Sequence, residues 1–503
     1  MLLALLAAML VQAPPPPHRI LIRDVTIVSP ERKAPLQRGY VVLENDRIAA
    51  VGQGAPPTAR WDSVVPGGGR VLIPGLIDGH THLAMTAGMP IPVPPELQPL
   101  AAAYAEQLPR SYLYSGFTTV VDLAVFDRAF LDRFKATPLH PDTYDCGPAL
   151  ALANGYPMAM LPKEVRWDVF PNFLWDPRRQ DSIPGRFRPA DHTPKATVAR
   201  VAADGGICVK TFEERGFGPA RNLPTPTLAM IQDVVRESHA RGLPVLLHAN
   251  SLAAWRFATR AQVDIIAHGM WNWDELEQTS AGVERSHPER SEGGMRSGMP
   301  APIRALLDTV AARRIGFMPT LRVMDGLGAM FDPAFLDDPR LARVVPQSLI
   351  AWYRTPAGQA YAVEMRRGFG NAGDARIREL IGHVTEHGAL ATRYLAAHGG
   401  RLVFGSDTPS GPTYGNPPGL NGFLELERLA AAGIPLPRLL ASATIDAARA
   451  FHLDSLYGTI EPGKMANLLL LRANPLETVE AYDAIDVVIV RGKLLDRSVL
   501  AAR

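Results

Sequence analysis

A pair of histidines closes an apolar segment near the start of the chain and could bind a metal ion. The segment is Val71-Leu-Ile-Pro-Gly-Leu-Ile-Asp-Gly-His80-Thr-His82. In a β-strand, residues two positions apart project from the same face, with their backbones about 6 to 7 Å apart. Two imidazoles at this spacing suit one cation, although a His-x-His pair on its own is equally well explained by coincidence.

Two further histidines and one aspartate also end apolar segments. His248 follows the run Pro-Val-Leu-Leu, His268 the run Asp-Ile-Ile-Ala, and Asp407 the run Leu-Val-Phe-Gly-Ser. Taken singly, each histidine could be a hydrogen-bonded core residue and Asp407 a helix N-cap. Taken with the His80 pair at one edge of one sheet, they are better explained as ligands of a shared metal. Asp407 could also take a proton from a metal-activated water.

Lys210 lies inside the apolar segment Ile-Cys-Val-Lys-Thr-Phe of a chain whose basic residues are nearly all arginine. Burial lowers the pKa of an ammonium group and so favours the neutral amine. A neutral amine can react with carbon dioxide to form a carbamate, an anionic ligand able to bridge two metal ions about 3.5 to 4 Å apart. The alternatives are an ion pair with Glu213 or Glu214, or the binding of a substrate carboxylate.

The segments that carry these residues have the pattern of short buried strands separated by amphipathic helices, which is typical of βα units around a parallel sheet. About eight strands can be assigned on this pattern. They cover residues 72–77, 118–123, 142–152, 206–211, 244–248, 264–268, 315–320 and 401–407. Eight βα units predict an α/β fold of the distorted TIM (β/α)8 barrel type, with its active site at the carboxyl ends of the strands.

Both ends of the chain contain short strand patterns joined by turns. Because they flank a middle of different character, we expect residues 18–73 and 456–503 to build one small β-sandwich together. The barrel then occupies residues 74–455.

Three connections within the barrel region are longer than the roughly 2 to 6 residues usual for βα loops. Residues 84–110 and 324–374 carry apolar and aromatic side chains, so they could cover the strand ends. Residues 280–300 are polar and aperiodic, which predicts an exposed insertion without chemistry.

The composition favours an ordinary globular protein that acts on small molecules. Hydrophobic residues make up 47% of the 503 residues and charged residues 20%, which excludes gross disorder. The formal net charge of +2 gives no electrostatic footprint for nucleic acid. We therefore expect a small-molecule substrate and no nucleic-acid partner, and the sequence is compatible with a homo-oligomer.

Residues 1–17 predict a signal peptide followed by a proline-rich spacer. The apolar run ends in Val-Gln-Ala, where a signal peptidase requires small residues, and it is too short to span a bilayer. The mature protein is then expected to be periplasmic or secreted, without a membrane span. A cytoplasmic location is the alternative, because no Lys or Arg precedes Arg19.

Cys146 and Cys208 are the only cysteines. Two are too few for a scaffold built on disulfides. We expect two buried free thiols that act as small apolar residues, with a single bridge as the alternative.

Together these motifs resemble the amidohydrolase superfamily. Pro74-Gly-Leu-Ile-Asp-Gly-His-Thr-His82 is similar to its first-strand motif, and Gly116-Phe-Thr-Thr-Val-Val-Asp122 to the segment that follows on the second strand. Glu461-Pro-Gly-Lys-Met-Ala-Asn-Leu468 is similar to a stretch of the closing β-sandwich, and the other strand-end residues occur in the expected order. The chain is most similar to the imidazolonepropionase-like and Xaa-Pro or Xaa-Arg dipeptidase branch.

The resemblance implies Zn²⁺ as the cofactor, with two ions bridged by a carboxylated lysine, or one ion as the alternative. It implies these ligands: His80 and His82 on the first metal, His248 and His268 on the second, Lys210 as the bridge, and Asp407 as ligand and proton acceptor. The residues around Lys210 are unusual for the superfamily, which leaves the carbamate open.

These residues predict hydrolysis of an amide bond, in a dipeptide or an N-acyl amino acid. A metal lowers the pKa of its bound water towards about 7, so that hydroxide can attack a polarised carbonyl. Asp407 would accept the proton and pass it to the leaving nitrogen, while His268 or His248 helps to hold the oxyanion. Five polar or aromatic residues near the expected mouth are candidates for substrate binding: Tyr156, Arg215, Trp271, Arg322 and Tyr414. An arginine there would favour a substrate carboxylate.

Two other functions compete with this interpretation. The first is a mononuclear deaminase or cyclic-amide hydrolase. Deaminase-like members of the superfamily usually have a glutamate three residues after the fifth-strand histidine, and Ser251 at that position counts against deamination. The second is a non-catalytic scaffold that kept the barrel, which would have no need of five intact ligand positions.

Overall fold

The computed structural model describes residues 17–179, 183–217, 220–273 and 299–503. The predicted signal peptide, except for residue 17, and nearly all of the insertion predicted at 280–300 lie outside these ranges. Among the helices of the described ranges, none combines the length and the apolar character needed to cross a membrane.

Eight parallel strands within the described residues form the centre of the molecule. They divide into two hydrogen-bonded sheets, β6-β7-β8 and β9 to β13. Their bounds are β6 (Leu76–Thr81), β7 (Phe117–Asp122), β8 (Asp142–Asp145), β9 (Val209–Glu213), β10 (Val245–Ala249), β11 (Ile265–Ala267), β12 (Gly316–Met318) and β13 (Arg401–Leu402). Their residues are almost all buried, as expected for strands covered by helices.

Backbone contacts join the two sheets at both seams and close the barrel. At the first seam, between β8 and β9, Leu150 forms a parallel bridge with Thr211. At the second seam, Thr81 at the end of β6 forms a parallel bridge with Thr408, beyond β13. The predicted distorted (β/α)8 barrel is therefore confirmed.

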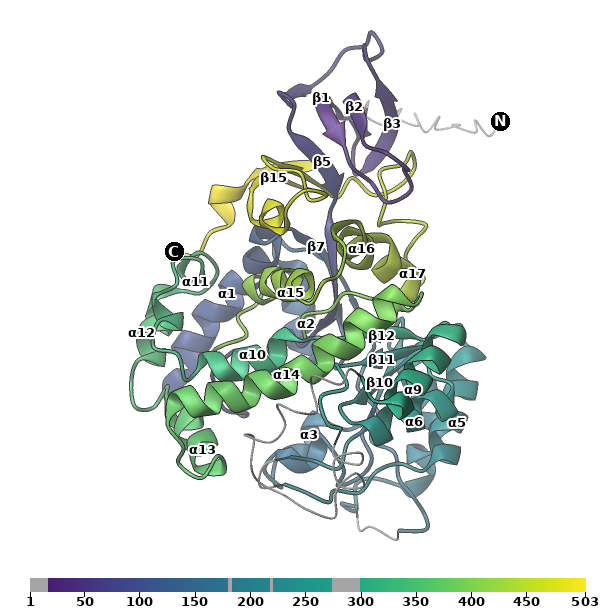
Figure 1. Cartoon of the computed structure of the whole chain (residues 1–503), viewed down its shortest axis with the longest axis vertical. Coiled ribbons are helices and arrows are strands. Elements are labelled where there is room, and N and C mark those ends of the chain that lie inside the picture. Colours follow the sequence, from purple (N-terminus) through teal and green to yellow (C-terminus); the bar gives the residue numbers. More distant parts are fainter. Residues whose placement is uncertain (1–16, 180–182, 218–219, 274–298) are drawn as a thin grey trace, which may run out of the picture.

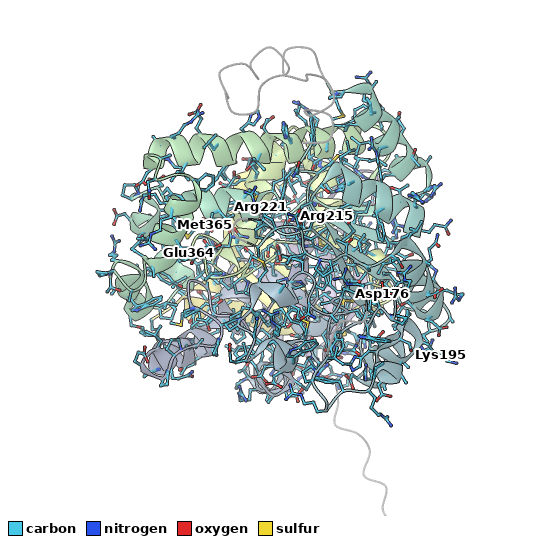
Figure 2. All side chains as sticks on the ribbon, turned by 90° about the horizontal axis from the view of Figure 1, so that it is seen from below. Asp176, Lys195, Arg215, Arg221, Glu364 and Met365 are labelled. Atoms are coloured by element: carbon cyan, nitrogen blue, oxygen red, sulfur yellow. A yellow bond between two sulfur atoms is a disulfide. The ribbon has the colours of Figure 1, made fainter. Side chains whose placement is uncertain are left out.

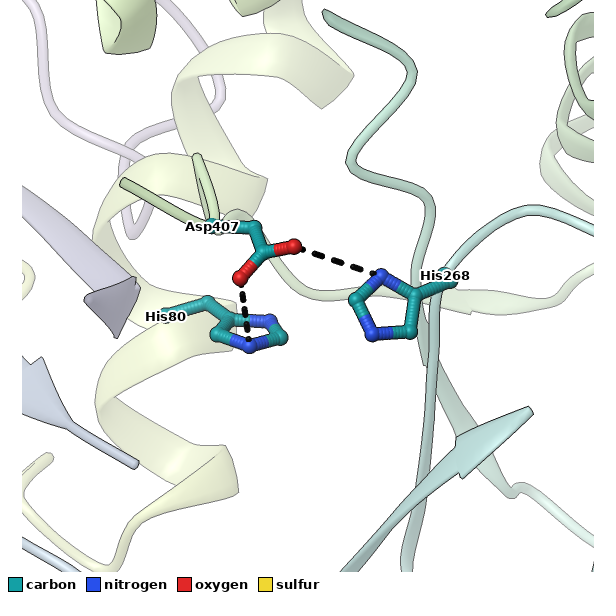
Figure 3. Close-up of side chains that lie close together, drawn as sticks. All are labelled: His80, His268 and Asp407. Carbon is teal, nitrogen blue, oxygen red and sulfur yellow. Dashed lines mark ion pairs between the residues drawn. The ribbon is translucent and has the colours of Figure 1, made fainter. Parts of the chain in front are cut away.

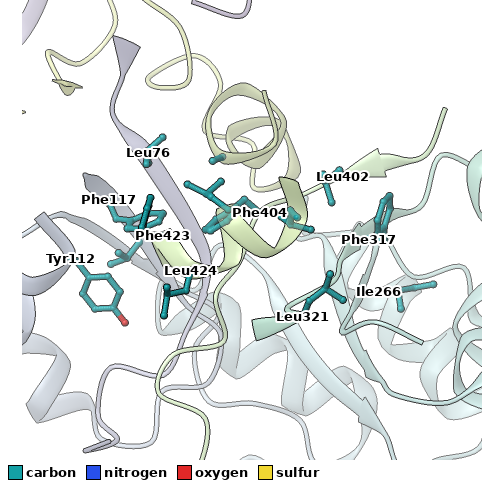
Figure 4. Packing of buried hydrophobic residues seen from close by; sticks show 14 of the residues in the cluster. Leu76, Tyr112, Phe117, Ile266, Phe317, Leu321, Leu402, Phe404, Phe423 and Leu424 are labelled. Atoms are coloured by element: carbon teal, nitrogen blue, oxygen red, sulfur yellow. The ribbon is translucent and has the colours of Figure 1, made fainter. Parts of the chain in front are cut away.

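Helices surround the strands and bury their outward-facing side chains. They include α1 (Gln98–Tyr114), α2 (Arg128–Ala136), α4 (Pro194–Ala203), α5 (Leu228–His239), α6 (Leu252–Ala261), α9 (Ala301–Ala312), α14 (Asp374–Ala397), α15 (Leu420–Ala431), α16 (Leu436–Ala441) and α17 (Ala447–Ala450). Figure 4 shows part of this core, where the rings of Phe117 and Phe404 stack with their centroids 5.5 Å apart. Inside the barrel, apolar residues such as Ile77, Leu246 and Met318 form a second buried cluster.

Strands from the two ends of the chain form a separate sheet at one end of the molecule (Figure 1). Its order is β16-β15-β14-β5-β1-β2-β3, with β4 paired to β1. The bounds are β1 (Arg19–Ile27), β2 (Leu36–Glu44), β3 (Arg47–Gln53), β4 (Ser63–Pro66), β5 (Val71–Pro74), β14 (Leu468–Leu471), β15 (Ile485–Val490) and β16 (Lys493–Asp496). We call it the terminal sheet.

The strand predicted at 72–77 is wrong as a single element. Residues Val71–Pro74 pair with β14 and β1 in the terminal sheet, whereas β6 begins at Leu76 in the barrel. Gly75 makes the change of sheet possible: its N–H donates to Asn467, and a Cβ there would collide with the side chain of Thr118. One apolar run thus serves two sheets.

The two long connections fold against each other beside the barrel. The first contains α1, and the second contains α10 (Arg322–Ala329), α11 (Leu341–Val344), α12 (Gln347–Tyr353) and α13 (Ala360–Gly368). Helix α1 packs against α11 and α12, and the Tyr353 hydroxyl donates to the Ala87 carbonyl over 2.7 Å. Figure 1 shows this group on the side of the molecule opposite α5, α6 and α9.

The expectation of two free thiols is wrong, because Cys146 and Cys208 form a disulfide. Cys146 follows β8 and Cys208 precedes β9, so the bridge lies at the first seam, with a Cα–Cα distance of 4.4 Å. Both cysteines are fully buried. Sequence spacing gave no indication of this contact, because it depends on two strands 62 residues apart becoming neighbours.

Candidate metal centre

Three buried side chains converge at the carboxyl ends of the barrel strands: His80 lies in β6, His268 directly follows β11, and Asp407 lies in the segment after β13. Each of His80, His268 and Asp407 offers one ligand atom, and these atoms all lie within 4.8 Å of one another. Asp407 lies between the two rings, with Oδ1 3.2 Å from His80 Nε2 and Oδ2 3.7 Å from His268 Nδ1 (Figure 3). This grouping could hold a cation.

His82 and His248 extend the cluster on either side. His82 Nε2 lies 3.0 Å from Asp407 Oδ1, so one carboxylate oxygen faces both histidines of the His-x-His pair. The ring of His248 lies 4.3 Å from that of His268, centroid to centroid. All four histidines and Asp407 that the sequence singled out are therefore brought together.

Lys210 faces the same cluster from β9. Its Nζ lies 3.3 Å from His80 Nε2, and the side chain is almost completely buried. Burial lowers the pKa of Lys210 to about 8, although the nearby Asp407 carboxylate acts in the opposite direction. Glu214, one of the two predicted partners of Lys210, instead lies against His248, with 3.7 Å between Oε2 and Nε2.

The electrostatics of the cluster suit a bound metal. Burial holds the pKa of both His80 and His268 well below the usual range. The positive charges of Lys210 and of the neighbouring histidines act in the same direction. Neutral imidazoles keep a lone pair for a cation. The Nδ1 atoms of His80 and His82 are also buried without a hydrogen-bond partner in the described part of the chain. A set of neutral imidazoles and one carboxylate fits a divalent transition metal.

Asp78 is a buried carboxylate with no role predicted from the sequence. It joins the strand of His80 to the segment of Asp407. Asp78 accepts hydrogen bonds from the backbone N–H of His80 over 3.2 Å and from that of Ser406 over 2.9 Å. Burial raises the pKa of Asp78 to about 6, and the hydrogen bonds to Ser406 partly offset this. Its position inside an apolar strand, two residues before His80, was the available indication.

Two of the predicted substrate-binding residues lie against the histidines. The Tyr156 ring is 4.6 Å from that of His248, and the Trp271 ring is 5.5 Å from that of His268. Burial raises the pKa of the Tyr156 hydroxyl, and the Asp407 carboxylate adds to this effect. Tyr156 is therefore a neutral hydrogen-bond donor within electrostatic reach of Asp407.

The other three candidates are placed differently. Arg215 is exposed on the face opposite the terminal sheet (Figure 2). The backbone N–H of Arg322 donates to Glu425, and burial lowers the pKa of its guanidinium, while carboxylates on α10 and α15 act in the opposite direction. Tyr414 is buried, with its hydroxyl bonded to the Met330 carbonyl and its ring stacked 5.1 Å from that of Tyr353. Tyr414 is thus a packing residue.

Aromatic side chains that the sequence analysis did not single out also line the cluster. Phe126 stacks on His82, with ring centroids 5.7 Å apart and an interplanar angle of 26°. Phe212, two residues after Lys210, lies 5.9 Å from His248, and Phe217 lies 5.7 Å from Tyr156. The polar centre therefore has an apolar border.

Comparisons with known proteins agree with this geometry. A family model described as the Amidohydrolase family matches residues 71–495. A solved Xaa-Pro dipeptidase with bound methionine superposes with a TM-score of 0.64 at 19% identity, covering 95% of this chain and 100% of that one. The A. niger ochratoxinase superposes with a TM-score of 0.62 at 17% identity, covering 96% of each chain. At these identities the two structures show a shared fold.

A curated relative matches only a short segment. The 5-methylthioadenosine/S-adenosylhomocysteine deaminase of Moorella thermoacetica is 36% identical over 93 residues, which make up 18% of this chain and 18% of the deaminase. The chain thus aligns with less than a fifth of that relative's length.

Proposed function

The chain belongs to the amidohydrolase family and is a hydrolase of carbon–nitrogen bonds, and we propose that it cleaves the amide bond of a dipeptide or N-acyl amino acid. The observation that carries this proposal is the strand-end cluster of His80, His268 and Asp407, with the Tyr156 donor beside it. Amide hydrolysis requires an activated water, a proton acceptor and a donor to the carbonyl oxygen. A buried cation site, the Asp407 carboxylate and the neutral Tyr156 hydroxyl can supply these three functions.

The family is metal-dependent, and the cofactor proposed here is Zn²⁺. Two ions are proposed: the His80 pair would hold one, His248 and His268 would hold the other, and a carboxylated Lys210 would serve as a further ligand. The closeness of Lys210 to His80 and its lowered pKa support this arrangement. When bound, such ions lower the pKa of water and polarise a carbonyl.

The residues of the chain divide the remaining work. In the reaction, a water oxygen bonds to the carbonyl carbon and the carbon–nitrogen bond breaks. Asp407 accepts the proton that the water loses and passes it to the leaving nitrogen. Tyr156 donates a hydrogen bond to the carbonyl oxygen, where negative charge develops, because burial keeps its hydroxyl protonated.

The apolar border favours a substrate with an aromatic or branched apolar acyl group. Phe126 and Tyr156 each present a ring beside a metal-binding histidine, and Phe217 continues this surface outward with 48% of its surface exposed. Aromatic pairs of this kind contribute about 0.5 to 1.5 kcal/mol beyond the area they bury. Arg215, exposed on the same loop as Phe217, supplies a positive charge for the substrate carboxylate.

Deamination is the second candidate, supported by the short match to a deaminase. The Ser251 hydroxyl, at the position where deaminase-like members usually carry a glutamate, accepts a hydrogen bond from the Ala254 N–H over 3.1 Å and caps α6. A helix cap at this position supplies no carboxylate for proton transfer. We therefore rank amide hydrolysis first.

A substrate screen on the zinc-loaded protein tests the proposal. The panel contains dipeptides and N-acyl amino acids with aromatic, branched and acetyl groups, together with adenosine nucleosides. The wild type is expected to release a free amino acid, and Asp407→Asn is expected to release none. Ammonia release from nucleosides without amide cleavage would overturn amide hydrolysis in favour of deamination. Metal analysis, with two Zn²⁺ per chain expected, tests the proposed number of ions.

The proposed location is the periplasm or the exterior of the cell. The disulfide between Cys146 and Cys208 supports it, because such bonds persist in oxidising compartments. Expression of the full sequence in a bacterium with a periplasm should give a periplasmic protein that begins after Ala13. A full-length cytoplasmic product would contradict this location.

A further inference from the structure

Thr320 makes a direct contact with one of the metal-binding histidines. It follows β12, is fully buried, and its Oγ1 lies 2.9 Å from His268 Nδ1. We propose, resting on the proposed function, that Thr320 is a positioning residue that fixes the tautomer of His268 and so presents Nε2 to the metal. In the sequence, Thr320 ends a predicted strand and has no assigned role.

The surroundings of His268 determine where its single ring proton lies. A neutral imidazole carries one N–H and one lone pair. Two oxygens face Nδ1, namely Thr320 Oγ1 at 2.9 Å and Asp407 Oδ2 at 3.7 Å. The Asp407 carboxylate can only accept a hydrogen bond, and the Thr320 hydroxyl oxygen can accept one at the shorter distance, so together they favour a proton on Nδ1 and leave the lone pair on Nε2. A partner that holds the second nitrogen of a metal-binding histidine sets its orientation and its basicity.

The backbone at Thr320 shows that this position is imposed by its surroundings. Its φ is +47°, a left-handed conformation that is rare for a β-branched residue. Such outliers persist where the neighbouring structure holds them, and they gather at functional sites. His268 also has a left-handed φ, of +80°, so the histidine and its partner both lie in unusual turns.

Two sets of hydrogen bonds hold these turns. The N–H groups of His268 and Gly269 donate to the carbonyls of Met318 and Pro319, each over 2.7 Å, and so join the turn after β11 to the turn after β12. On the other side of Thr320, the buried Glu425 of α15 accepts from the next two backbone N–H groups, those of Leu321 over 3.0 Å and Arg322 over 2.7 Å.

Glu425 therefore caps helix α10 from another helix. The residue at the N-cap of α10, Leu321, provides no side-chain cap of its own. Orphan N–H groups at a buried helix start require an acceptor, and the Glu425 carboxylate meets two of them. In this way Glu425 fixes the start of α10. Thr320 directly precedes the N-cap of this helix, so Glu425 also holds the position of the hydroxyl that faces His268.

Three substitutions at Thr320 test the role of the hydroxyl. Zn²⁺ affinity is measured by competition with a chromophoric chelator, and Co²⁺ loading gives a visible spectrum that reports ligand geometry. Thr320→Val removes only the hydroxyl and should weaken metal binding by about 10- to 100-fold, with an altered Co²⁺ spectrum. Thr320→Ser keeps the hydroxyl and should bind like the wild type. Thr320→Gly suits the left-handed backbone and should still lose affinity, with its folding checked by circular dichroism.

Wild-type affinity in Thr320→Val or Thr320→Gly would overturn the proposal. The proposal would also be overturned if Thr320→Ser lost as much metal affinity as Thr320→Val. Because serine keeps the hydroxyl, such a loss would point to packing as the cause. Because the assay needs no substrate, a protein that binds metal as expected but cleaves no amide would overturn the proposed function alone.

Substitutions of Glu425 test how Thr320 is held. Glu425→Leu removes both acceptor oxygens and should weaken metal binding, whereas Glu425→Gln keeps one acceptor and should have a smaller effect. Glu427→Gln is the matched control, because Glu427 lies on the same helix and pairs with Arg340 instead. Equal affinity in Glu425→Leu and Glu427→Gln would refute the part assigned to Glu425.

Discussion

Removal of the disulfide between Cys146 and Cys208 should cost the protein a large part of its stability. The bridge closes a segment of 62 residues. In the chain-entropy model, a loop of this length stabilises the folded state by about 4 kcal/mol. Because whole domains are stable by only about 5 to 15 kcal/mol, the double variant Cys146→Ala/Cys208→Ala should unfold at a clearly lower urea concentration.

Two measurements check this prediction. Thiol titration of the wild type in denaturant should give no free thiol before reductant and two per chain after it. Urea unfolding should show that Cys208→Ala lowers the free energy of unfolding by nearly as much as the double variant does, because either change removes the whole bridge. The reasoning fails if two thiols react without reductant, or if the double variant unfolds within about 1 kcal/mol of the wild type.

The remaining predictions concern the metal centre and its surroundings. Asp407→Asn should lower kcat by about 10²- to 10⁴-fold in steady-state assays, while metal analysis still finds bound ions. Phe126→Ala should raise KM for substrates with an aromatic acyl group by about tenfold and leave KM for acetyl substrates nearly unchanged. Burial raises the pKa of Glu425 to about 8, above its usual 4.5, so the stability that Glu425 contributes should be full below pH 4.5 and fall as the pH rises towards 8. Relative to Glu425→Gln, urea unfolding should show the wild type losing up to about 1.4 kcal/mol per pH unit in that window. Removal of metal with a chelator should lower the melting temperature, and Zn²⁺ at 100 times its Kd should restore about 3 kcal/mol.

The sequence predicted the fold in considerable detail, because the barrel strands are short apolar runs with polar residues at their carboxyl ends. It placed the boundary between the terminal sheet and the barrel within about two residues, but it predicted one strand across that boundary, since residues 71 to 77 read as one apolar run. Gly75 divides that run through contacts with Asn467 and Thr118, which are distant in sequence.

The candidate site was predictable where a residue type is rare in a strand. Histidines, Lys210 and Asp407 are costly in apolar segments unless they bind something, and the structure brings them together. Of the residues that support them, Asp78 stands out as a carboxylate inside an apolar strand, whereas Thr320 and Glu425 were not predictable. Thr320 is an ordinary strand residue by type, and Glu425 occupies an ordinary helical position. Their importance arises from tertiary contacts alone.

From the architecture we expect metal binding and barrel closure to support each other. His80 lies in a strand of the three-stranded sheet and His268 directly follows a strand of the five-stranded one, so a cation held by both would connect the two sheets. In the part of the chain that the structure describes, isolated backbone bridges join the two sheets at the seams, and each seam carries a further link. The disulfide lies at the first seam, and Asp78 bonded to Ser406 lies at the second, beside Asp407. Because the cation site is complete only when the two sheets meet, a bound ion stabilises the closed barrel as well as supplying chemistry.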